Sequence, residues 1–262
     1  MLKTNKSKMR LISLTLLLFI QLGTFAQEKQ RTLYLNAGTQ NTWERDHAYS
    51  PLIFKGSSIG FTMGYASSSH KKTDEVYLHY SRLPLQNSFN AQMTGTHASI
   101  LTYSFYKAEW LPEQLTIGWS NNNALSVRNF EDAQNFNPRF DFHTSFGPAL
   151  RYQTSFGNQQ QWRFSSQTHW QLIGFLLSAS YVTSPPDPFL HEQSTFNAFW
   201  QSIRFFQPLQ QYDLSILNQL FYRLKNGNEI GIGYRFHFTS LENAHRSQRS
   251  GGNYFFQLNF KI

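Results

Sequence analysis

Polar and apolar residues alternate with a period of two along much of this chain, which is the pattern of β-strands with two unlike faces. The stretch EIGIGYRFHFTS, residues 229–240, has its large apolar side chains on one face, at Ile230, Ile232, Tyr234, Phe236 and Phe238. Residues 213–224 and 253–262 alternate in the same way. The segment KNGNE, which joins 213–224 to the next strand, carries Asn-Gly, a strong hairpin signal. The C-terminal part therefore predicts three consecutive antiparallel strands.

The alternation extends toward the N-terminus with decreasing clarity and predicts twelve strands. They are expected at residues 33–41, 57–66, 74–82, 97–106, 113–121, 139–152, 161–172, 173–182, 196–206, 213–224, 229–240 and 253–262. The clear ones have about the 9–11 residues that a tilted membrane strand requires. The stretch WQLIGFLLSASYV is ambiguous, because it forms either two strands meeting near Ile173 and Gly174 or one long strand. Ten strands is therefore the alternative count.

The N-terminus has the order of a secretory signal peptide, with four cationic residues, an apolar run from Leu11 to Ile20, and small residues before Ala26. We predict a cleaved signal at 1–26 and one domain at 27–262. The apolar run is about half the length needed to span a bilayer, which argues against an uncleaved anchor.

The composition of the chain indicates the environment of the predicted strands. Aromatic residues make up 17% of the chain, yet the mean hydropathy is −0.46. Beyond the signal, no stretch approaches 18 consecutive apolar residues, so transmembrane helices are not expected. An aromatic-rich chain that alternates strictly and is polar on average is typical of a transmembrane β-barrel. We predict an all-β protein, a closed antiparallel barrel in the membrane; a soluble secreted β-sandwich is the alternative.

The end of the chain, GGNYFFQLNFKI, supports the membrane class. It resembles the C-terminal assembly signal of Gram-negative outer-membrane β-barrel proteins, in which large apolar residues alternate to the last position. The matching residues are Tyr254, Phe256, Leu258, Phe260 and Ile262. Those proteins typically end on Phe, so Ile262 is a departure. The resemblance implies a location in the outer membrane, with the lipid bilayer, lipopolysaccharide and the barrel-assembly machinery as partners.

Charge and cysteine content exclude several functions. Four of the basic residues behind the net charge of +8 lie in the predicted signal, and no basic run or motif suggests nucleic-acid binding. Cysteine is absent, which excludes disulfides and thiolate metal sites. No cofactor motif is present. The first strand starts soon after the signal, so the plug domain of energy-coupled receptors is not expected.

The polar face of the strands is where function is expected in a membrane barrel. The candidates for lining the lumen are Asp141, Arg163, His169, Asp213, Arg223, Glu229, Arg235 and His237. They form either a narrow, porin-like pore or solute-binding cavity, or a packed lumen in which paired charges fill space. The first hypothesis is therefore a pore or a small-solute binding and transport protein.

Two further hypotheses rest on shorter features. The segment HTSFG resembles the His-x-Ser-Asn pattern of outer-membrane phospholipase A and lipid A deacylase barrels, with His143 and Ser145 in place. Phe146 stands where the Asn belongs, which argues against a lipid hydrolase. This pair is the one catalytic candidate. The other hypothesis is a structural or partner-binding barrel, whose predicted outer loops at 42–55 and 121–139 engage another envelope protein.

Glu44, Asp46 and His47 cluster in the first of these predicted loops. Carboxylate and imidazole side chains can bind a cation, but a solvated loop is the more ordinary account of such a cluster. We therefore predict no metal site. A long segment at 183–195 is expected as a turn on the opposite, inner side.

Overall fold

The structure is a computed structural model that describes residues 29–47, 50–130, 138–178, 194, 197, 203–205, 212–242 and 246–262. The predicted signal peptide and the segment 183–195 lie outside these residues. Among the described residues, no helix has the length and apolar character to cross a membrane.

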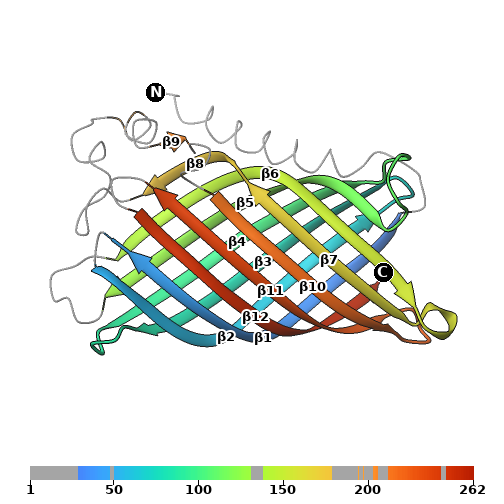
Figure 1. The fold of residues 1–262 in the computed structure, drawn as a ribbon, viewed down its shortest axis with the longest axis horizontal. Coiled ribbons are helices and arrows are strands. Elements are labelled where there is room, and N and C mark those ends of the chain that lie inside the picture. The colour runs from blue at the N-terminus through green and yellow to red at the C-terminus, as the bar shows by residue number, and fades with distance from the viewer. Residues whose placement is uncertain are drawn as a thin grey trace, which may run out of the picture.

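Ten antiparallel strands form a closed barrel (Figure 1). In ring order they are β1 (Gln30–Asp46), β2 (Ser50–Ser68), β3 (Lys72–Gln86), β4 (Gln92–Tyr106), β5 (Leu115–Phe130), β6 (Arg139–Phe156), β7 (Trp162–Gln171), β10 (Tyr212–Arg223), β11 (Glu229–Glu242) and β12 (Arg246–Lys261). The first and last strands close the ring by pairing from Thr32 opposite Lys261 to Asp46 opposite Ser247. Each of the ten ring strands thereby pairs with a neighbour on both sides, as a bilayer requires. The prediction of a closed antiparallel barrel is confirmed.

Two short strands lie outside the ring. β8 (Ile173–Ser178) pairs with β6, and β9 (Arg204–Phe205) pairs with β8. β7 and β8 pair with successive parts of β6. The register shifts by one residue between the pair Ala149–His169, on β7, and the pair Phe146–Ile173, on β8. β10 pairs with β7 and not with β8. The ring therefore has the alternative count of ten strands, and the strands expected at 173–182 and 196–206 add only β8 and β9 beside it.

The two ends of the barrel differ. At the turn end lie the connections 69–71, 107–114, 157–161 and 224–228, together with the C-terminus (Figure 1). The connection 157–161 includes a short 3-10 helix, η1 (Asn158–Gln160). The predicted Asn-Gly hairpin is present there: Gly227 has a φ of 83°, and Leu224 N–H donates to Asn228 O at 2.8 Å. We call the opposite end, where β1, β3, β5 and β11 finish, the loop end.

The strands extend further toward the loop end than predicted. β1 has 17 residues, β2 has 19 and β5 has 16, so most of the segments 42–55 and 121–139 is strand. The prediction of outer loops there is wrong. The cause is that the regular alternation breaks down near this end: the polar Asn41 is exposed on β1, whereas the apolar Phe54 points inward on β2.

The outer surface of the barrel is apolar. Among the side chains that point outward, Ile59 on β2 is 63% exposed, Phe61 on the same strand is 59% and Phe256 on β12 is 71%, as the alternation predicted for these two strands. Their neighbours along each strand point inward and are buried. A soluble barrel has the reverse arrangement, with apolar side chains inside. An apolar belt around a polar interior is the organisation of a membrane barrel.

Glycines inside the barrel make room for aromatic rings. The ring of Phe255 lies over Gly233 on the neighbouring strand, so that a Cβ at position 233 would lie 2.4 Å from the ring. Phe255 is only 5% exposed and has little freedom to move. Gly60 also faces inward, but a Cβ there would meet nothing closer than 3.4 Å.

We expect Gly233→Ala to lower the free energy of unfolding by about 1–3 kcal/mol, the usual cost of forcing a filled interior apart. Gly60→Ala is the matched control and is expected to be neutral or slightly stabilising. Urea unfolding in phospholipid vesicles, followed by tryptophan fluorescence, measures both. Equal effects of the two substitutions would contradict the packing described here.

Candidate functional site

The interior of the barrel is filled by polar and charged side chains at three levels. The structure places the eight predicted lumen residues there, but not in one group. Five of them line a central cavity: Asp141, His169, Asp213, Arg235 and His237. The other three, Arg163, Arg223 and Glu229, form an ion cluster near the turn end. Their part in any function stays a prediction.

The ion cluster at the turn end runs along one wall. Glu229 on β11 accepts hydrogen bonds from Arg163 Nε at 3.1 Å and from Asn259 Nδ2 at 2.9 Å, and Arg223 Nη2 lies 3.8 Å away. The guanidinium of Arg163 also stacks over the ring of Phe221, 4.2 Å from its centroid. These residues come from β7, β10, β11 and β12, which are neighbours in the ring. The cluster therefore lines a wall and does not bridge the lumen.

Side chains from different walls meet in what we call the inner layer, made of Glu75, Tyr77, Tyr103, Arg151 and Gln167. Arg151 on β6 forms an ion pair with Glu75 on β3, and its Nε donates to Gln167 Oε1 at 3.2 Å. Tyr77 donates to Glu75 at 3.1 Å. Tyr103 Oη and His169 Nδ1 are 2.6 Å apart, which is a short hydrogen bond. All five side chains are buried, so this layer leaves little free space.

A second layer, the outer layer, lies toward the loop end and consists of Glu44, Asp46, Arg128, Arg139 and Asp141. Arg128 on β5 reaches Asp46 at 3.0 Å and Glu44 at 3.3 Å, and it also pairs with Asp141. Arg139 on β6 reaches Asp46 at 3.1 Å. β1 lies opposite β5 and β6 in the ring, so these ion pairs cross the lumen. All five residues are at most 2% exposed.

Sequence reasoning missed the outer layer. It assigned Glu44 and Asp46 to a solvated loop with His47, whereas the structure places both carboxylates inside the barrel, bonded to arginines. Arg128 and Arg139 were not among the candidates. One signal was available: Gln40, Thr42, Glu44 and Asp46 continue a period-two polar face beyond the expected end of the first strand. In the described part of the chain, no three His, Asp or Glu side chains are placed to share a metal ion.

An apolar cluster lies beside the outer layer. Phe54 on β2, Leu83 and Leu85 on β3, and Met93 on β4 point inward and are at most 2% exposed. Phe130 packs against them, with its ring centroid 5.2 Å from that of Phe54. This cluster fills part of the lumen near the loop end.

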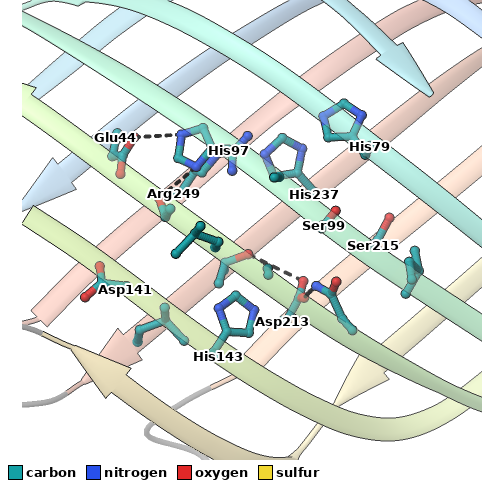
Figure 2. Close-up of a pocket in the computed structure, with 18 of the residues that line it drawn as sticks. Glu44, His79, His97, Ser99, Asp141, His143, Asp213, Ser215, His237 and Arg249 are labelled. Carbon is teal, nitrogen blue, oxygen red and sulfur yellow. Dashed lines mark hydrogen bonds and ion pairs between the residues drawn. The ribbon is translucent and has the colours of Figure 1, made fainter. Parts of the chain in front are cut away.

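The two layers bound a polar cavity of about 120 Å³ (Figure 2). Glu44, Arg128 and Asp141 of the outer layer line one side, and His169, which bonds to the inner layer, lines the other. The cavity is rich in histidine; those that line it are His79, His97, His143, His169 and His237. Its remaining charged side chains are Asp213, Arg235 and Arg249.

Hydrogen bonds fix several of the lining groups. His97 bonds through Nδ1 to Ser126 Oγ at 2.7 Å, and its Nε2 lies 3.5 Å from Glu44 (Figure 2). Thr62 Oγ1 is 2.9 Å from His79 Nδ1. Asp213 accepts from Asn122 Nδ2 at 2.8 Å and from Thr239 Oγ1 at 3.4 Å. The cavity is thus built from side chains held in place, as a binding site requires.

His143 and Ser145, the catalytic candidates, both point into the barrel. Ser145 is 1% exposed and donates its hydroxyl to Gln171, while His143 lines the cavity. The outward position next to them belongs to Phe146, which is 43% exposed. A lipid in the bilayer would meet Phe146 and not the His–Ser pair. The role as a lipid hydrolase stays an untested prediction with this geometry against it.

The C-terminal residues of the predicted assembly signal lie on the outer surface. Tyr254 is 60% exposed, Phe256 is 71%, Leu258 is 42% and Ile262 is 71%, and Phe260 is half-buried on the same face. This strand also closes the ring with β1. Recognition of these residues by an assembly machinery stays a prediction.

No protein-family model matches the chain, and no curated protein matches it in sequence. Solved outer-membrane proteins share a partial structural similarity. The toluene transporter TbuX of Ralstonia pickettii is 6% identical over 90% of each chain, with a TM-score of 0.44. The β-domain of the Bordetella autotransporter BrkA is 9% identical, with a TM-score of 0.43 over 90% of this chain and 99% of that one. Neisserial surface protein A is 12% identical, with a TM-score of 0.35 over 88% and 97%. At these values none of them indicates what this chain does.

Proposed function

We propose that this protein is an outer-membrane barrel that passes or binds a small solute, with its lumen obstructed in the present conformation. The observation that carries the proposal is the outer layer, in which ion pairs from β1 to β5 and β6 cross the lumen above a polar cavity. Among the described residues, side chains on the strands obstruct the path. Long charged side chains can exchange partners without unfolding a strand, so such a layer can open.

The apolar belt supports the membrane part of the proposal, since a charged interior wrapped in exposed Ile, Phe and Tyr side chains suits lipid outside and polar contents inside. The outer membrane in particular is inferred from the predicted signal peptide and the C-terminal resemblance. The cavity separates this proposal from a merely packed lumen, because charges that only fill space would leave no room of this size between two layers.

Conductance tests the proposal. In planar bilayers we expect the refolded wild-type protein to be closed most of the time. The double variant Arg128→Ala/Arg151→Ala removes one guanidinium from each layer and is expected to give discrete, salt-dependent current steps. The double variant Arg82→Ala/Lys55→Ala changes two exposed, outward-facing cations and is the matched control, expected to behave as wild type.

Heat-dependent migration on gels establishes that each protein is folded before the recordings. A folded Arg128→Ala/Arg151→Ala barrel that conducts no more than wild type would contradict the channel and favour a structural barrel. The lipid-hydrolase and partner-binding hypotheses have no comparable support among the described residues, because the His–Ser pair faces away from lipid and the expected loops are mostly strand.

A further inference from the structure

In the described interior of the barrel, three charged side chains form no ion pair. The acids Glu44, Asp46, Glu75, Asp141 and Glu229 all pair with arginines. Within the described residues, Arg235 and Arg249 form no ion pair; Arg249 lies opposite Glu44 in the pairing of β12 with β1, but that carboxylate is bonded to Arg128. Asp213 accepts hydrogen bonds only from the neutral groups of Asn122 and Thr239. All three line the central cavity. An ionisable group held inside a membrane protein is costly unless a partner offsets its lost hydration, so unpaired ones mark a site of function.

The strand register fixes how these groups face one another. Asp213 on β10 is opposite Thr239 on β11, and Thr239 is opposite Arg249 on β12. The three side chains point inward on adjacent strands, so the backbones of Asp213 and Arg249 are about 10 Å apart, twice the spacing of neighbouring strands. Thr239 stands between them, and they do not pair. Arg235 lies further along β11, opposite Asn253.

Other polar atoms around the cavity are also left without partners. Gln40 Oε1, Asn253 Oδ1 and His237 Nε2 are buried and make no hydrogen bond with any described residue. Gln40 is 2% exposed and Asn253 is 7%. Native interiors satisfy most such atoms, so a group of them around one cavity calls for a polar occupant. The cavity of about 120 Å³ has about four times the volume that one water takes up in the liquid, about 30 Å³, which is enough for a compact polar molecule.

We propose that the central cavity binds a small zwitterion of the amino-acid type. Its ammonium group sits at Asp213, and its carboxylate sits at Arg249 with Arg235 near by. An anion alone would leave Asp213 unpaired, and a cation alone would leave both arginines unpaired; a molecule with both charges satisfies the two sides at once. This inference rests on the proposed function and specifies the class of solute.

L-alanine, propionate and ethylamine are the probes, since the last two are alanine without its amino group and without its carboxylate. Equilibrium dialysis against the refolded protein in detergent measures binding. We expect alanine to bind at least tenfold more tightly than either fragment. Asp213→Asn keeps the size and the acceptor oxygen but removes the charge, and it is expected to weaken alanine binding at least tenfold while leaving propionate unchanged. Arg249→Gln is expected to weaken alanine and propionate together.

Arg82→Gln, on the outer surface, is the matched control and is expected to bind alanine as wild type does. If Arg249→Gln fails to fold, Arg235→Gln tests the other unpaired cation that lines the cavity. Propionate binding as tightly as alanine would overturn the inference in favour of a carboxylate site, and ethylamine binding as tightly would overturn it in favour of a cation site. If none of the probes binds but the Arg128→Ala/Arg151→Ala variant conducts, the inference fails and the channel stands; if neither occurs, both fail.

Discussion

Replacing Arg128 with alanine is expected to lower the free energy of unfolding by about 3–5 kcal/mol, the range for breaking a buried ion pair from one side. Arg128 is 1% exposed and contacts three carboxylates, those of Glu44, Asp46 and Asp141. Its removal leaves three buried negative charges with Arg139 as the remaining cation of the outer layer. Repulsion among them and their lost hydration then act against the folded barrel.

Urea unfolding in phospholipid vesicles measures this loss, with Arg82→Ala as the control for losing an exposed arginine. An exposed cation contributes little, so the control is expected within about 0.5 kcal/mol of wild type. The double variant Arg128→Met/Asp141→Asn is expected to recover part of the loss, because it removes a positive and a negative charge together. A loss below about 1 kcal/mol for Arg128→Ala would mean that the carboxylates find other partners, and the outer layer would not be the structural bridge described here.

Replacing Phe256 with arginine tests the assignment of the outer surface to lipid. Phe256 is 71% exposed, and its neighbours on the adjacent strands, Ala37 and Ile232, face outward beside it. An arginine on the lipid face of a barrel costs about 2–4 kcal/mol near the middle of the bilayer. We expect Phe256→Arg to lower the free energy of unfolding in vesicles by that amount.

Phe89→Arg is the matched control, since Phe89 is equally exposed, at 76%, but lies in the connection between β3 and β4 at the loop end. It is expected to fold as wild type does. If Phe256→Arg also folds without loss, the apolar belt does not face lipid. The protein would then be a soluble barrel, and the soluble alternative considered from the sequence would be right about its environment. Both substitutions replace an exposed phenylalanine with arginine, one on the apolar belt and the other in a connection at the loop end.

Much of the architecture was predictable because successive residues of a membrane strand face the lumen and the lipid in turn, so the sequence alternates between polar and apolar side chains. The faces expected for β11 and for the last strand are those observed, with Ile230, Ile232, Phe256 and Leu258 exposed and Glu229, Asn253 and Gln257 buried. The hairpin turn between β10 and β11 was also predicted, from its Asn-Gly pair. The alternation did not predict strands near the loop end, because the inward side chains there are polar at Glu44 and Asp46 but apolar at Phe54. The strand count stayed open at β8, which pairs with β6 outside the ring of ten.

Sequence alone determined the class of the protein, the polar and apolar faces of its clear strands and the membrane environment that these faces fit, since each follows from residues two positions apart. Tertiary structure alone decided which charges meet. Glu44 and Arg128 are 84 residues apart and lie on opposite walls, so no local pattern joins them. The same holds for the cavity between the layers, because Asp213 and Arg249 become neighbours only through the pairing of β10, β11 and β12. Strand register across a closed ring is a property of the whole chain, and it is what turns scattered polar residues into a site.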